Sequence, residues 1–422
     1  MLTLRYLWGG EIWIIIWYPG ERNHIMWDTV PLSEEQSLIK NEIQNICSNF
    51  DHEYWRVRDK KNEYPQEFAE ILAENGWLGI LIPEKYGGAG MGTSEAMVML
   101  EEISANGAGF GGAQAIHGAI YTSAPVIKHA GEDLKSKLLP DLASGDKMMQ
   151  AFGLTEPNAG LDSTSIETTA ERDGDTYVIN GQKIWTSRLD VSDYYLVVAR
   201  TQPKEEVEKK TQGISLFVVD MDDAKSQGAI NYESIEKTSV NLSHSFEVWF
   251  DDLEVPASQI VGQEGDGFYC LLDGLNAERL VGSAEAVGLG RLAIERASEY
   301  ATSREVFDRP IGKNQAIQHP LAKSYAEVLA AKEVVYSSAA VLDEINQKDA
   351  GIRANVAKYL SAKAAFNAAD AAVQTHGGFG VAREFDVERY LRDARIIRIA
   401  PISQELALCY IAETALNLPR SY

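Results

Sequence analysis

The sequence predicts an α+β fold in which a helical domain, a middle domain of antiparallel strands and a second helical domain follow one another. Apolar residues recur at helical spacing from Ser33 to Gly145 and again from Phe268 to Leu416. Between these regions, short runs have the alternating pattern of strands, at residues 176–180, 195–199, 214–219 and 246–250. We therefore expect an N-terminal extension over residues 1–31 and three domains over residues 32–148, 149–261 and 262–422.

The first helical domain is marked by start and stop signals. Ser33 with Gln36 matches the capping-box pattern that begins a helix, and Pro65 begins another helix that Gly76 ends. Further helical runs are expected at residues 94–104, 113–129 and 132–143. The segment at residues 107–112 matches the GxGxxG pattern of dinucleotide-binding loops, but it follows a helical run rather than a strand. We expect a flexible turn there and no nucleotide site.

The middle and C-terminal regions differ in how their elements are connected. No helix-length segment separates the predicted strands and Asp173-Gly174 is a typical hairpin turn, so we expect an antiparallel sheet or a small barrel. After Pro256, long helical patterns with short connections predict an antiparallel four-helix bundle. The helical patterns lie at residues 268–303, 317–346 and 351–376, with shorter ones at 384–394 and 403–416.

Charge and composition exclude several classes of function. The chain carries 62 acidic and 39 basic residues, and a surface with a net charge of -23 repels phosphate backbones and anionic lipid headgroups. We therefore expect no nucleic-acid partner and no membrane insertion. The three cysteines and seven histidines show no metal-ligand spacing, so we expect no metal site and reduced thiols in a cytoplasmic protein.

The first residues form a stretch rich in Trp and Ile, from Leu7 to Tyr18. Glu11 interrupts this stretch, which is too short to span a bilayer and is followed by no small-residue cleavage site. We interpret it as an upstream extension of a chain that begins near Met26, with a targeting role as the alternative.

Five segments carry the candidate chemistry. FGLTEPNAGLD from Phe152 and NGQKIWTS from Asn180 place hydroxyls and an aromatic ring at strand ends beside a tight Pro/Gly turn. The others are REVFDRPIGKNQAIQ from Arg304, QTHGGFG from Gln374 and RDAR from Arg392. In this order, the segments resemble the FAD-dependent acyl-CoA dehydrogenase family, and the resemblance runs from about residue 32 to residue 422.

The resemblance implies two groups of residues that contact FAD. Residues of the middle domain are expected to face the isoalloxazine ring, and residues of the bundle are expected to hold the rest of the cofactor, some of them from a neighbouring subunit. The implied contacts are Phe152, Leu154, Thr155, Trp185, Thr186, Ser187, Arg304, Phe307, Gln315, Gln374, Gly377, Gly378, Ser403 and Glu405. Arg304 suits the pyrophosphate because a planar guanidinium binds phosphate through two hydrogen bonds. Leu161 departs from the family, which usually has Ser there.

The position of the catalytic base also departs from the common family pattern. In most members a Glu follows the RDAR motif, but the matching residue here is Pro401, which offers neither a carboxylate nor an N–H group. A minority, including isovaleryl-CoA and long-chain enzymes, carry the base on the first bundle helix, in a segment like LNAERL. The resemblance thus implies Glu278 as the base and Asn276 and Arg279 as substrate contacts, with Glu405 as a rival base.

The chemistry of the base sets a condition on its surroundings. An ordinary Glu, with a pKa of about 4.3, is a weak base for a proton next to a thioester, so a dry site must raise that pKa. Two donors remain as alternatives for polarising the thioester carbonyl, the Ile402 N–H and a ribityl hydroxyl of FAD.

The implied activity is FAD-dependent α,β-dehydrogenation of an acyl-CoA thioester to the trans-2-enoyl-CoA. Electron-transferring flavoprotein is the implied electron acceptor, and a homo-oligomer, as a tetramer built from two dimers, is implied because subunits share cofactor contacts. The alternatives are an acyl-CoA oxidase on the same scaffold and, because of Pro401, a non-catalytic flavin scaffold.

Overall fold

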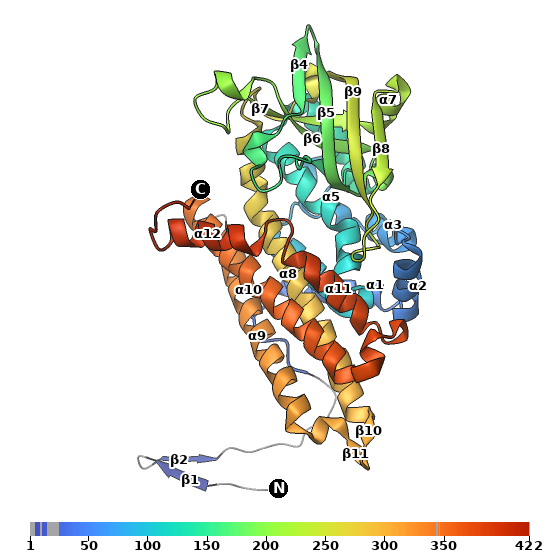
Figure 1. Ribbon diagram of the computed structural model, residues 1–422, viewed down its shortest axis with the longest axis vertical. Helices are drawn as coiled ribbons and strands as arrows, with labels where there is room; N and C mark the ends of the chain where they lie inside the picture. The colour runs from blue at the N-terminus through green and yellow to red at the C-terminus, as the bar shows by residue number, and fades with distance from the viewer. Residues whose placement is uncertain (1–4, 9–10, 15–24, 343–344, 346, 422) are drawn as a thin grey trace.

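The computed structural model describes residues 5–8, 11–14, 25–342, 345 and 347–421. Figure 1 shows an elongated molecule with a sheet at one end and long C-terminal helices that run to the other end, with the first helices beside them. Near the N-terminus, strands β1 (Arg5–Trp8) and β2 (Glu11–Ile14) pair as an antiparallel hairpin. Residues 15–24 lie outside the described part, so the interpretation of the extension stays a prediction.

The first helical region contains one more helix than its sequence signals indicate. Its helices are α1 (Glu34–Cys47), α2 (His52–Lys61), α3 (Gln66–Glu74), α4 (Thr93–Ile103), α5 (Gly109–His129) and α6 (Glu132–Ser144). The capping box of α1 is confirmed, since the Ser33 side chain accepts from the Gln36 N–H at 3.0 Å and the Gln36 side chain accepts from the Ser33 N–H at 3.2 Å. The additional helix, α2, begins after Asp51, whose side chain caps it by accepting from the Tyr54 N–H at 2.8 Å.

The GxGxxG segment is a buried kink between α4 and α5, not a flexible turn. Asn106 and Gly107 leave helical geometry there. The Arg389 guanidinium donates to the carbonyl oxygens of Gly107 and Ala108 at 3.0 and 2.8 Å, which fixes the kink against the C-terminal region. Both carbonyl oxygens are therefore occupied by hydrogen bonds to Arg389.

The middle domain is a seven-stranded sheet with mixed strand directions. Its strands are β3 (Ala151–Gly153), β4 (Thr169–Asp173), β5 (Thr176–Ser187), β6 (Tyr194–Arg200), β7 (Ile214–Asp220), β8 (Ile230–Ser234) and β9 (Ser245–Pro256). The order is β3-β6-β4-β5-β9-β8, with β7 paired to β6. The pairs β4–β5, β5–β9, β6–β7 and β8–β9 are antiparallel as predicted, but β3 and one residue pair of β4 run parallel to β6. A short helix, α7 (Met221–Gln227), also lies between β7 and β8.

Strand β6 lies between two apolar layers. Leu196 and Val198 belong to a core shared with α5 and α6, whereas Tyr195 and Val197 belong to a core with β5 and β9. The alternation that we expected at residues 195–199 is therefore wrong, because this strand is covered on both faces and is buried at every position.

The C-terminal region is organised around one very long helix. Its helices are α8 (Gly267–Ser303), α9 (Gln315–Ala339), α10 (Gln347–His376), α11 (Val387–Ile397) and α12 (Gln404–Thr414). The strands β10 (Glu305–Val306) and β11 (Arg309–Pro310) form a hairpin between α8 and α9. Since α8 has 37 residues, it is about 55 Å long.

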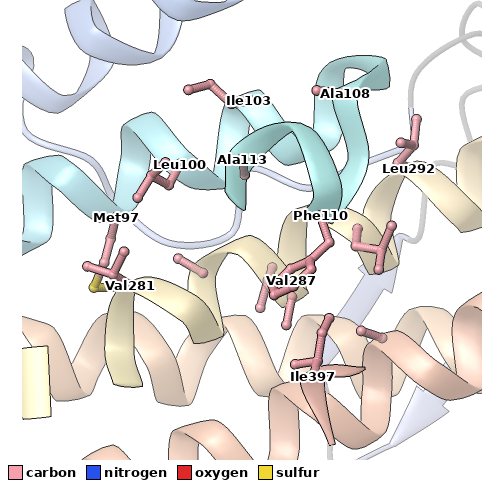
Figure 2. Close-up of a cluster of buried hydrophobic side chains, with 14 of the residues drawn as sticks. Met97, Leu100, Ile103, Ala108, Phe110, Ala113, Val281, Val287, Leu292 and Ile397 are labelled. Carbon is pink, nitrogen blue, oxygen red and sulfur yellow. The ribbon is translucent and has the colours of Figure 1, made fainter. Parts of the chain in front are cut away.

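The two helical regions share one hydrophobic core. Figure 2 shows Met97 and Leu100 of α4 and Phe110 of α5 packed with Val281 and Val287 of α8. The same core extends to α9, α10 and α11. The helices on both sides of the middle domain in sequence therefore fold as one unit that carries the sheet at one end.

A buried network of charges also joins these helices. Glu101 of α4 accepts from Lys332 Nζ at 2.8 Å and from the Tyr336 hydroxyl at 2.6 Å, and Arg291 of α8 donates to Glu102 at 2.7 Å and also pairs with Glu101. Burial alone would raise the pKa of Glu101, but Lys332 and Arg291 hold that pKa at about 2. The carboxylate is therefore ionised inside the core.

Candidate active site

Glu278 lines a pocket between α5, α8 and the strands β3 and β6. The empty volume of the pocket, including open solvent, is about 240 Å³. Its described lining residues are Tyr121, Pro125, Phe152, Leu196, Leu271, Gly274, Leu275 and Glu278. Glu278 is the one carboxylate among them, and Phe152 is a predicted FAD contact. The structure thus brings the predicted base and one predicted cofactor residue to the same apolar pocket.

The surroundings of Glu278 meet the condition set by the chemistry. The side chain is 8% exposed, and burial raises the pKa of its carboxyl group. His117, Arg279 and Arg188 act in the opposite direction, but the pKa of Glu278 stays above the ordinary value. A carboxylate in this environment is a stronger base than one in water.

The two predicted substrate contacts lie beside Glu278 on α8. Asn276 is buried, and its Oδ1 accepts from Arg279 Nη1 at 2.8 Å. Burial lowers the pKa of Arg279, while the charge of Glu278 raises it. The Arg279 guanidinium is thus held next to the base, although neither Asn276 nor Arg279 is among the described residues that line the pocket.

The two middle-domain segments that are predicted to face the flavin are joined to each other by a backbone hydrogen bond. The Ile184 N–H donates to the Thr155 carbonyl at 2.9 Å. Below them, Lys183 Nζ donates to Glu156 Oε1 at 2.6 Å and to the Leu154 carbonyl at 3.3 Å. This buried ion pair fixes the turn that carries Leu154 and Thr155, because Glu156 also accepts from two backbone N–H groups of residues 167 and 168.

The side chains at the end of β5 differ in their exposure. Trp185 is 55% exposed and has a left-handed φ of 62°, a strained conformation for a bulky residue. The neighbouring Thr186 is fully buried, and its hydroxyl contacts the Tyr195 hydroxyl at 2.9 Å. Ser187 is half-buried. Trp185 therefore offers a ring to a ligand, whereas the Thr186 side chain faces the domain interior.

A prediction follows from the ion pair beneath this turn. Lys183→Met is expected to destabilise the protein by about 1–3 kcal/mol, because Glu156 keeps its backbone donors but loses its buried cation. FAD should also bind more weakly, since Leu154 loses a donor to its carbonyl. Thermal denaturation and FAD titration of the apoprotein measure both effects. Lys225→Met, at an exposed position of the same domain, serves as the control, and equal behaviour of the two variants would contradict the prediction.

The predicted FAD contacts at residues 304–315 and 374–378 lie at the other end of α8. Arg304 follows the last residue of this helix and lies 26 positions after Glu278, which corresponds to about 39 Å along the helix. Phe307 on the adjacent hairpin is 93% exposed. Gly377 and Gly378 lie near the same end, because His376 stacks on Tyr300 with ring centroids 4.2 Å apart. Figure 1 shows this end of the bundle far from the sheet.

Two predicted contacts lie at the start of α12. The Ser403 hydroxyl accepts from the Leu406 N–H at 3.1 Å and so caps this helix. Glu405 is exposed and is not among the described residues that line the pocket, unlike Glu278. Pro401 is exposed as well.

Four residues around Glu278 were not indicated by any sequence motif. They are His117, Tyr121, Arg188 and Glu285. Their partners lie far away in the sequence, so no local motif identifies them as residues of the site. The only available signal is that each is a polar residue within or next to an apolar pattern. Among the described residues, no group of His, Cys, Asp and Glu could hold a metal ion, and no helix has the length and apolar character needed to cross a bilayer.

The residues present fit FAD. An exposed tryptophan and half-buried hydroxyls at one site suit a flavin ring, and an exposed arginine and an exposed phenylalanine at the other site suit a pyrophosphate and an adenine. An added Cβ at Gly377 or Gly378 would meet no atom within 4 Å, so the surface there is open to a ligand.

Comparisons with known proteins agree with this arrangement. Three models of acyl-CoA dehydrogenase domains match the chain, the N-terminal domain at residues 33–146, the middle domain at residues 151–253 and the C-terminal domain at residues 265–416. Acyl-CoA dehydrogenase FadE12 of Mycobacterium tuberculosis is 38% identical over 395 residues, which cover 92% of this chain and 98% of that protein.

Solved structures show the same fold. The complex of glutaryl-coenzyme A dehydrogenase with glutaryl-CoA has a TM-score of 0.86 and 30% identity, and the match covers 93% of this chain and 98% of that chain. A structure described as the electron transferring flavoprotein of Acidaminococcus fermentans has a TM-score of 0.85 and 29% identity, covering 92% and 99%. This chain therefore belongs to the acyl-CoA dehydrogenase family, and it is an FAD-dependent oxidoreductase that acts on CH–CH groups.

Proposed function

We propose that this protein converts an acyl-CoA thioester to the trans-2-enoyl-CoA and passes the electrons to an electron-transferring flavoprotein. The observation that carries the proposal is the buried Glu278 carboxylate, which lines an apolar pocket together with Phe152 of the flavin-facing segment. In the reaction, Glu278 takes the proton from the α-carbon, so the C–H bond breaks and an O–H bond forms on the carboxylate. FAD, when bound, supplies the acceptor for the hydride from the β-carbon.

The pocket explains why a carboxylate can do this work. Its other described lining residues are apolar or aromatic, so water is largely excluded and the charge on Glu278 is poorly solvated. Transfer of the α-proton removes that unfavourable charge. The adjacent Arg279, whose guanidinium donates to Asn276, supplies a positive charge that acts on Glu278.

Anaerobic mixing of the FAD-loaded protein with a panel of acyl-CoA thioesters tests the proposal. We expect the flavin absorbance to bleach with at least one acyl-CoA, and the product to be the enoyl-CoA. Reduced enzyme should then be reoxidised faster by electron-transferring flavoprotein than by oxygen. Rapid formation of peroxide in air would instead identify an oxidase, and no bleaching with any acyl-CoA would support a non-catalytic flavin scaffold. The similarity to the Acidaminococcus fermentans structure supports the choice of acceptor.

We also propose that two subunits share each FAD, in a homotetramer built from two such dimers. Glu278, which shares its pocket with Phe152 of the first group of FAD contacts, lies about 39 Å along α8 from Arg304 of the second group, and this distance is longer than one FAD extends. Phe307, exposed at 93% on its hairpin, is an apolar side chain that a ligand and a partner subunit would cover.

Subunit complementation provides the corresponding prediction. Arg304→Gln and Trp185→Ala are each expected to lower FAD occupancy, the first by loss of a charge-assisted phosphate contact and the second by loss of the ring. Co-expression of the two variants should restore a fraction of tight FAD sites, because one site per mixed dimer then has both groups intact. Differently tagged chains allow the mixed species to be isolated and its FAD content measured. No recovery in the mixed species would contradict the shared site.

A further inference from the structure

A second buried carboxylate lies on the same helix as Glu278. Glu285 is seven residues further along α8, about two turns, so both side chains leave the same face of the helix. Glu285 is completely buried, and its two oxygens contact Gln114 Nε2 at 2.7 Å and His117 Nδ1 at 2.8 Å. Both of these partners come from α5, the helix that forms the opposite wall of the pocket.

His117 contacts both this carboxylate and a residue that lines the pocket. Tyr121, one turn further along α5, lines the pocket with Glu278, and its ring centroid lies 4.9 Å from that of His117. His117 is itself 5% exposed. Of the charged groups around Glu278, His117 has the largest effect on its pKa, and it favours the ionised form.

The other titratable groups near Glu278 include two arginines that have partners of their own. These groups are Tyr121 from α5, Arg188 after β5, and Arg279 and Glu285 from α8. Arg188 Nη1 donates to the Gln114 carbonyl at 2.7 Å and to Ser243 Oγ at 3.2 Å, and Arg279 Nη1 donates to Asn276. The charge of these two guanidinium groups is fixed, because arginine stays protonated in proteins. His117 is the imidazole among the described groups that act on the pKa of Glu278, and Glu285 binds its Nδ1.

We propose that His117, held at Nδ1 by Glu285, is a positioning residue that keeps Glu278 ionised before proton transfer. His117 is not among the described residues that line the pocket, so it acts through Glu278 rather than on the substrate. This inference rests on the proposed function of Glu278 as the base. Burial provides basicity, and His117 ensures that the carboxylate is not already protonated when the substrate arrives.

The pH dependence of α-proton exchange tests the inference. Exchange of the α-proton of a bound acyl-CoA in D₂O, followed by mass spectrometry, requires proton removal but no net oxidation. In His117→Gln, which replaces the imidazole with a neutral amide, the acid limb of the exchange rate should move to higher pH by about one unit or more, because the group that lowers the pKa of Glu278 is lost. The rate above the limb and the FAD content should stay close to those of the unchanged protein. His117→Asn is the second variant, should the first not fold.

A matched control separates this effect from a loss of packing. His52→Gln replaces a partly buried histidine of α2, outside the pocket, and its acid limb should coincide with that of the unchanged protein. An acid limb that does not move in either His117 variant would overturn the positioning role and leave the dehydrogenation intact. Exchange without flavin reduction would overturn the dehydrogenation but not the role of His117. No exchange with any acyl-CoA of the panel would overturn both.

Discussion

Glu278→Gln is expected to slow reduction of the flavin by acyl-CoA by about 10²–10⁴-fold, the usual contribution of a general base. Glutamine has nearly the same shape as glutamate but cannot accept the α-proton. Glu278 is 8% exposed, and the other described residues that line the pocket are apolar or aromatic. None of these lining residues can therefore act as the base in its place. Single-turnover bleaching of the FAD-loaded variant measures the effect, and FAD content shows whether the fold is retained.

The rival carboxylate supplies the matched control for this result. Glu405→Gln makes the same chemical change at an exposed position outside the described pocket lining, and flavin reduction should stay close to that of the unchanged protein. Retained reduction in Glu278→Gln together with loss in Glu405→Gln would reverse the assignment. Because the pKa of Glu278 is raised, the acid limb of flavin reduction in the unchanged protein should lie above the ordinary range of a glutamate.

Arg291→Met is expected to destabilise the protein by about 3–5 kcal/mol, because it removes the cation that pairs with two buried carboxylates. Glu101 would keep Lys332 and Tyr336, but Glu102 would lose its arginine partner inside the core. The network joins α4 of the first helical region to α8 and α9, so its loss should weaken the shared core. Thermal denaturation of the FAD-loaded protein detects the change.

The pH dependence of stability gives this prediction a second readout. The folded-state pKa of Glu101 is about 2, below the ordinary value, so its contribution is present above the ordinary glutamate range and is lost as pH falls toward 2. In Arg291→Met the pKa of Glu101 should rise, and stability should fall at a higher pH. Lys323→Met, which removes an exposed partner 3.9 Å from Glu327, should change stability by less than about 1 kcal/mol. Equal effects of the two substitutions would contradict a role for burial.

Local patterns in the sequence were sufficient for most of the architecture. The capping box at Ser33, the helical spacing of α8 and the short connections after it depend on residues close in the chain, and the structure confirms them. The parallel pairing of β3 with β6 could not be predicted, because it joins segments more than 40 residues apart with no turn signal. The burial of both faces of β6 could not be predicted either, because it depends on which distant elements cover the strand.

The residues of the candidate site also differ in how far the sequence could indicate them. Glu278 could be proposed because its segment LNAERL resembles that of family members with the base on this helix, and the structure places Glu278 in the pocket. His117 and Glu285 could not, because each side chain acquires its role from a partner 168 residues away. The left-handed φ of Trp185 could not be predicted either, because a tryptophan side chain does not favour this backbone conformation.

The continuity of α8 limits how the chain can change in length. This helix connects the residue proposed as the base with the end of the bundle that would face a partner's cofactor. Insertion of one residue would turn everything beyond it by about 100° and move it by about 1.5 Å, so Arg304 would leave its direction relative to the pocket. The loop at residues 204–210 lies between β6 and β7 and has no such constraint. Natural variation in length is therefore expected in that loop, while the number of residues between Glu278 and Arg304 stays fixed.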